Sequence, residues 1–144
     1  MRTRLALLSA SFIAAIAFVA CSDSGAPTIG GAWARPGAAG AQTAAYLTIT
    51  GAAGQADALL SASSPDAGTV ELHEATTDAS GMMGMRPIDR LDIPAGETIE
   101  LKPGGFHLMV MGLARELAVG GTLELELVFE RAGKVVVRAE IRQG

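Results

Sequence analysis

The stretch "TLELELVFE", residues 122 to 130, places a leucine or phenylalanine at every second position, with glutamate or valine at most positions between. Successive side chains of a β-strand point to opposite faces, so this alternation is typical of a strand with one buried and one solvated face. Five further segments show the same period: "AAYLTIT" (44–50), "TVELHE" (69–74), "ETIELK" (97–102), "FHLMVM" (106–111) and "KVVVRAEIR" (134–142). We therefore predict an all-β protein.

The segments between these strands carry the proline and glycine that tight connections need. They are "SSPDAG" (63–68), "DIPAGE" (92–97), "KPGG" (102–105) and "RAGK" (131–134). No stretch of ten residues or more shows a convincing amphipathic helical repeat. Several short antiparallel strands at regular spacing predict a single β-sandwich or Greek-key β-barrel domain.

The first residues, "MRTRLALLSASFIAAIAFVAC", have the charged start and short apolar run of a secretory signal peptide, which we assign to residues 1–20. The final "FVAC" resembles a bacterial lipobox, which predicts a lipid on Cys21; cleavage to a soluble secreted protein is the alternative. Ser22 favours the outer membrane. We expect a periplasmic, lipid-anchored protein with a flexible tether at residues 21–31 and a domain at 32–144.

Without residues 1–20, 9 basic and 15 acidic residues remain, a net charge of about −6 with neutral histidines. This balance argues against a nucleic-acid partner, since no basic patch is present. Cys21 is the only cysteine, so an acylated chain has no free thiol and no disulfide. With no nucleophilic cysteine and no recognisable catalytic triad, we expect a protein that is not an enzyme.

Histidine and methionine are confined to one part of the chain. Beyond the initiator, all of them lie between residues 73 and 111: His73, Met82, Met83, Met85, His107, Met109 and Met111. Methionine used only to fill a core should be scattered. The strand alternation also assigns His73, and the group at 107, 109 and 111, to the face opposite the buried one.

These side chains favour a soft metal ion. Thioethers are uncharged and bind no proton near neutral pH, so with imidazole and no thiolate they suit Cu(I), whereas zinc would normally use cysteine or more histidine and carboxylate. Two histidines could also hold Cu(II). In the alternative interpretation, the histidines are ordinary surface residues, Met111 packs rather than binds, and Met82 and Met83 face solvent.

Segments along the chain resemble the periplasmic copper chaperones called PCu(A)C. They are "AWARP" (32–36), "AAYLTIT" (44–50), "VELHE" (70–74), "MGMRPI" (83–88) and "LKPGGFHLMVMGL" (101–113). The resemblance implies a cupredoxin-like β-barrel that binds one Cu(I) per chain. It implies delivery of copper towards the CuA centre of cytochrome c oxidase, with oxidase subunit II or a Sco-type thioredoxin-like assembly factor as acceptor. We expect a monomer.

The resemblance assigns His73, Met85, His107 and Met109 as the copper ligands. Twenty-one residues separate Met85 from His107, as in the family motif, but eleven rather than ten separate His73 from Met85. The extra residue falls in a segment containing glycine and serine, so Met85 is the better assignment. Met83 is the reserve ligand, and Met111 is a possible addition.

Other functions and roles stay open at this point. An electron-transfer cupredoxin would need a cysteine thiolate at its copper, and a metal-free structural domain would not use His107 or Met109. A copper buffering or resistance protein would share every ligand with a delivery protein. Glu71 and Glu74 could orient an imidazole, and we expect Trp33 and Tyr46 to be core packing residues.

Overall fold

The computed structural model describes residues 25–144, so the predicted signal peptide and Cys21 lie outside the described residues. The described chain forms ten strands and contains no helix. The strands are β1 (Thr28–Ala34), β2 (Thr43–Thr50), β3 (Asp57–Ser63), β4 (Ala67–Thr77), β5 (Met83–Pro87), β6 (Leu91–Ile93), β7 (Thr98–Leu101), β8 (Phe106–Leu113), β9 (Thr122–Phe129) and β10 (Gly133–Ile141). The all-β prediction is confirmed.

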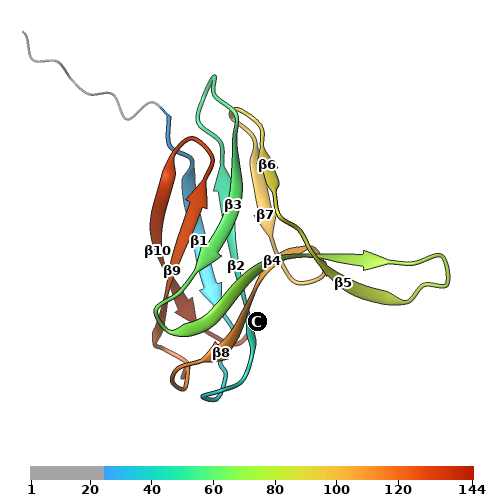
Figure 1. The fold of residues 1–144 in the computed structure, drawn as a ribbon, viewed down its shortest axis with the longest axis vertical. Coiled ribbons are helices and arrows are strands. Elements are labelled where there is room, and N and C mark those ends of the chain that lie inside the picture. Colours follow the sequence, from blue (N-terminus) through green and yellow to red (C-terminus); the bar gives the residue numbers. More distant parts are fainter. Residues whose placement is uncertain (1–24) are drawn as a thin grey trace, which may run out of the picture.

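Seven of the strands form a closed barrel (Figure 1). Their order is β4, β8, β2, β1, β10, β9 and β3, and β3 pairs again with β4 to close the ring. The pairs are antiparallel except β1 with β10. Three further strands extend the sheet: β5 pairs with β4, β6 with β3, and β7 with β2. Closure protects the barrel strands from unpaired edges.

The alternation did not predict β1, β3 or β6, and the first two of these contain irregularities that hide it. The pairing of β1 with β2 shifts register between Gly30 and Trp33, and that of β3 with β9 shifts between Leu59 and Ser61. A bulge inserts a residue and breaks the period of two. β6 has only three residues. Because β1 begins at Thr28, residues 28–31 belong to the sheet and not to the predicted tether.

The barrel interior is filled by the side chains that the alternation assigned to the buried face. Leu123, Leu125 and Leu127 are fully buried, and Phe129 is 2% exposed. Each such side chain contributes roughly 1.5–3 kcal/mol by leaving water. All ten strands and the whole described core lie within residues 25–144. This segment holds a closed barrel and its core, so we use it as the soluble domain in the experiments below.

One hairpin extends beyond the barrel. β4 continues past its contact with β8 and returns as β5, and the two strands project from the body of the molecule (Figure 1). The pattern "GMMGMRP" (81–87) is compatible with a methionine-rich loop or a short strand, and in the structure Met83–Pro87 form a strand. Nowhere in residues 25–144 is there a helix of the length and apolar character needed to cross a membrane.

Candidate metal site

The two histidines face each other across neighbouring strands. His73 of β4 is the register partner of His107 of β8, and their ring centroids lie 5.7 Å apart. Both rings lie on the outer face of the sheet, because their neighbours Leu72 and Leu108 belong to the core. His107 is nevertheless buried, with 4% of its surface exposed. Alternation predicts on which face of the sheet a side chain lies, but packing by the surrounding strands determines how much of that side chain is exposed.

Each imidazole has one nitrogen occupied and one free. The Nδ1–H of His107 donates to the Gly105 carbonyl at 3.0 Å, and the Nε2–H of His73 donates to the Glu71 carboxylate at 2.8 Å. The other nitrogens, Nε2 of His107 and Nδ1 of His73, are buried without a hydrogen-bond partner in the described chain. In a neutral imidazole these nitrogens carry lone pairs. A buried polar atom left unpaired is costly, and a metal ion would satisfy both.

The turn from Lys102 to Gly105 fixes the position of His107. The N–H of Gly105 donates to the Lys102 carbonyl at 3.0 Å, with Pro103 and Gly104 between them. Gly104 has a φ of 81°, which favours glycine, and proline followed by glycine is typical of a type II turn. The Gly105 carbonyl accepts from Ala75 N and from His107 Nδ1. The "KPGG" turn thus sets the tautomer of His107.

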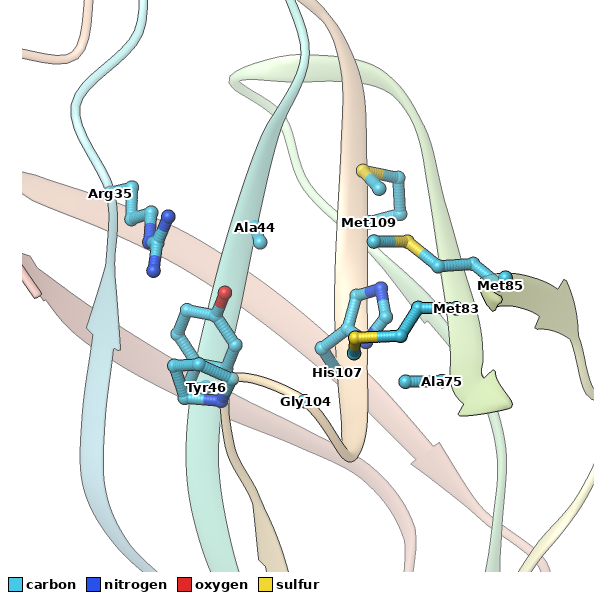
Figure 2. Close-up of a pocket in the computed structure, with 11 residues that line it drawn as sticks. Arg35, Ala44, Tyr46, Ala75, Met83, Met85, Gly104, His107 and Met109 are labelled. Carbon is cyan, nitrogen blue, oxygen red and sulfur yellow. The ribbon is translucent and has the colours of Figure 1, made fainter. Parts of the chain in front are cut away.

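Thioethers surround His107 in a pocket of about 470 Å³ (Figure 2). Met109 lies two residues along β8 on the same face, while Met83 and Met85 reach the pocket from the projecting hairpin. Met83 is 71% exposed and Met85 is 62% exposed, so this side of the pocket is open to solvent. The arrangement offers an imidazole and three sulfur atoms around one space, with the second imidazole beside it.

The register shows where each candidate ligand lies. Met85 pairs with Ala75 and Met83 with Thr77, so both methionines share a face with His73, whereas Gly84, at the strict family spacing, has no side chain to offer. The residues that line the pocket include His107, Met85, Met109 and the reserve Met83, but neither His73 nor Met111. His73 adjoins the pocket through its contact with His107. Met111 pairs with Thr69, away from the pocket.

A site of harder ligands is absent from the described residues. Within residues 25–144, no three histidine, cysteine, aspartate or glutamate side chains gather closely enough to hold a metal ion. For a metal bound to these two imidazoles, the methionine sulfurs of the pocket are the neighbouring side-chain ligands. Such a mixed nitrogen and thioether set favours a soft ion.

Tyr46 and Arg35 also line the pocket, and sequence reasoning missed both. The expectation that Trp33 and Tyr46 pack in the core holds for the burial of Tyr46, whereas Trp33 is half-buried. Tyr46 is buried, but it lies outside the core cluster and faces the pocket, and Trp33 stacks on it with ring centroids 4.5 Å apart. The signal was present in "AAYLTIT": Leu47 and Ile49 fill the core, so alternation places Tyr46 on the opposite face.

Glu71 holds His73 in the tautomer that leaves Nδ1 free, so the variant Glu71→Gln tests this contact. We expect Cu(I) affinity to fall by up to about tenfold, the lower end of the range for changes to the hydrogen-bond partner of a metal-bound histidine, because glutamine keeps an acceptor oxygen but loses the charge. The measurement is competition with a chromophoric Cu(I) chelator without oxygen. Glu100→Gln is the control, because Glu100 is exposed and, among residues 25–144, pairs only with Lys102. Equal Cu(I) affinities for Glu71→Gln and wild type would show that the Glu71 carboxylate does not support metal binding by His73.

Residues 28–141 match the model of a family described as "Putative lipoprotein LpqE-like". The chain belongs to the LpqE-like lipoprotein family. A protein named "Putative lipoprotein Lxx21020" from Leifsonia xyli subsp. xyli is 32% identical over 98 residues, which cover 68% of this chain. The match spans 58% of the length of that relative.

Solved structures with the same fold are named as PCuAC domains or as copper-bound proteins. The apo PCuAC domain from PmoF1 is 27% identical with a TM-score of 0.69, over 85% of this chain and 98% of that one. The Cu(I) form of DR1885 from Deinococcus radiodurans is 34% identical with a TM-score of 0.62, over 83% and 81% of the two chains. The predicted PCuAC-like, cupredoxin-like fold is confirmed. Neither name describes an enzyme.

Proposed function

We propose that this LpqE-like protein is a metallochaperone that carries one Cu(I) per chain, bound by His73, Met85, His107 and Met109. The observation that carries the proposal is a pair of buried imidazole nitrogens that have no partner in the described part of the chain and lie beside exposed methionine sulfurs. The similarity to DR1885, whose solved structure is titled as a Cu(I) form, supports the choice of ion. The ion is the cargo of the protein and not a catalytic cofactor.

The ligand types suit release as well as binding. Two neutral imidazoles and two thioethers add no negative charge, so they bind Cu(I) less strongly than a pair of thiolates does. Met85 is exposed, so an incoming thiolate can displace its sulfur before the buried His107 dissociates from the copper. Transfer to an acceptor with two cysteines therefore runs downhill.

We place this transfer in the periplasm, with the protein held to a membrane by a lipid on Cys21, the outer membrane being favoured by Ser22. The proposed route leads towards the CuA centre of cytochrome c oxidase, through oxidase subunit II or a Sco-type assembly factor. Membership of a lipoprotein family supports the anchor. We propose a monomer, since the ligands all come from one chain.

The test of the proposed function is a Cu(I) titration of the soluble domain under anaerobic conditions with a chromophoric competitor. We expect one equivalent to be withdrawn from the competitor; withdrawal of none would refute copper carriage. Delivery and buffering are then separated in a deletion strain. Loss of oxidase activity at low copper supports delivery, whereas copper sensitivity with normal respiration supports a buffering or resistance protein instead.

Met85 and Met83 can be ranked by substitution with leucine, which keeps the side-chain size and removes the sulfur. We expect Met85→Leu to weaken Cu(I) binding, because the primary thioether is lost, and Met83→Leu to leave it unchanged. The double variant should bind more weakly than Met85→Leu, since Met83 reaches the same pocket and serves as the substitute. The same Cu(I) competition assay measures all three. Identical affinities for the double variant and wild type would exclude β5 from the site.

A further inference from the structure

The pocket at His107 is far larger than one copper ion requires. A water molecule occupies about 30 Å³ of liquid, whereas the pocket measures about 470 Å³. The sulfur and imidazole groups occupy one end of it. Figure 2 shows Tyr46 and Arg35 on the other side of His107 from the β5 methionines. This second end has no part in binding copper through the proposed ligands.

The hydroxyl of Tyr46 is available to a ligand. Only 5% of Tyr46 is exposed, yet no hydrogen bond joins its hydroxyl to another group of the described chain. The hydroxyl oxygen itself is in contact with solvent, unlike the two buried imidazole nitrogens. In Figure 2 the oxygen points into the space between Arg35 and His107, and all three residues line the pocket. The hydroxyl can therefore donate a hydrogen bond to a group that enters.

Arg35 supplies a positive charge beside this hydroxyl. Its guanidinium carbon lies 5.9 Å from the centre of the Tyr46 ring. Trp33 also contacts Tyr46, and Arg142 lies over Trp33 at 4.9 Å. These contacts help to hold Tyr46 in place. In residues 25–144, Arg35 and Arg142 form no ion pair, whereas three other arginines are each paired with a carboxylate: Arg86, Arg90 and Arg115.

We propose that Arg35 and Tyr46 form a binding subsite for a carboxylate group, next to the copper ligands. A guanidinium matches the planar carboxylate with two parallel hydrogen bonds, and the tyrosine hydroxyl donates a third. The carboxylate comes either from a small free anion or from an aspartate or glutamate of a docking protein. A partner carboxylate held here would bring the partner's thiolates up to the exposed Met83 and Met85. This role in handover rests on the proposed function, whereas the subsite does not.

The subsite is tested on the copper-free soluble domain by NMR, with ¹⁵N-labelled protein at constant ionic strength. One series adds sodium acetate as the free carboxylate, and another adds a hexaglutamate peptide as the protein-borne one. We expect saturable shifts of the amide signals of Tyr46 and its neighbours. Binding should be at least about tenfold weaker in Arg35→Gln and in Tyr46→Phe, the cost of losing a hydrogen bond to a charged group.

The control is Arg138→Gln, because Arg138 is exposed on β10, forms no ion pair in the described chain and does not line the pocket. Its binding should equal that of wild type. Saturation by acetate alone identifies a free anion, and tighter binding of the peptide identifies a docking carboxylate; both support the subsite. No saturable binding, or equal binding in Arg35→Gln and wild type, overturns it.

Copper binding is measured separately on the same variants. We expect Arg35→Gln and Tyr46→Phe to take up Cu(I) with wild-type affinity, since neither residue is a proposed ligand. If wild type binds the carboxylate at Arg35 but withdraws no Cu(I) from the competitor, the copper proposal fails and the subsite stands. If Cu(I) binds and the carboxylate does not, the subsite proposal fails and the copper proposal stands.

Discussion

Replacing His107 with glutamine is expected to weaken Cu(I) binding by more than the roughly 10–100-fold that follows loss of a hydrogen-bond partner to a ligand. The reason is that Nε2 of His107 is buried, has no hydrogen-bond partner within residues 25–144, and belongs to a residue that lines the thioether pocket. Glutamine keeps much of the volume but replaces a soft nitrogen with an amide oxygen, a poor ligand for Cu(I). The measurement is the Kd from anaerobic chelator competition.

Two further variants make this result decisive. Met111→Leu is the matched control, because Met111 lies on the same strand and outside the pocket, and it should keep wild-type affinity. His73→Gln should also weaken Cu(I) binding. Because His73 is less buried than His107, this variant tests the site even if the His107 variant does not fold. Circular dichroism checks the fold of each. A folded His107→Gln protein with unchanged Kd would refute the ligand assignment.

The second large effect concerns stability and lies far from the copper pocket. Asp57 is 5% exposed and accepts three backbone hydrogen bonds. Its Oδ1 accepts from Ala58 and Arg131, at 2.8 and 2.9 Å, and its Oδ2 accepts from Ala132 at 3.0 Å. The side chain thus ties the start of β3 to the turn between β9 and β10. Asp57→Ala should cost about 3 kcal/mol of unfolding free energy, because the donors lose a charged acceptor.

Urea denaturation at neutral pH measures this loss, with Asp92→Asn as the control. Asp92 lies on β6, is exposed and pairs only with Arg90 in the described chain. Removal of such a surface pair should change the free energy by less than about 1 kcal/mol. A loss below about 1 kcal/mol for Asp57→Ala itself would mean that water replaces the carboxylate at the turn.

The same residue makes stability depend on pH. Burial raises the pKa of Asp57, but the hydrogen bonds from Arg131, Ala58 and Ala132 more than offset it, so the net pKa lies below its ordinary value of 3.8. A lowered pKa means that the folded state favours the carboxylate. The stabilisation is therefore complete above the ordinary pKa and is lost as pH falls through the folded-state value. The stability gap between wild type and Asp57→Asn should accordingly shrink at acidic pH.

The fold and the site differed in how far the sequence could predict them. Regular alternation placed His73, His107 and Met109 on the outer face, because period-two facing is a local property of a strand. The contact between His73 and His107 is not local. It depends on the register of β4 with β8, which the alternation alone does not specify.

Tyr46 and Arg35 show a second limit of sequence reasoning. The same alternation put Tyr46 on the outer face, but an aromatic residue amid apolar neighbours suggested core packing. What makes it a pocket residue is the pairing of β2 with β8, which sets Ala44 opposite Met109. The burial of Asp57 could likewise not be predicted from the sequence. Its three hydrogen-bond donors come from the chain around it and from a turn more than seventy residues away.

Because β5 lies on a projecting hairpin, closure of the barrel does not depend on metal binding. The ring of seven strands closes through β3 and β4 without β5, and the core fills it completely. Met85 belongs to the strand outside that ring. The ring can thus form before any metal binds. Under the proposed function, release of Cu(I) breaks the link between Met85 and the ligands on β4 and β8, whereas the ring stays closed through its own strand pairs.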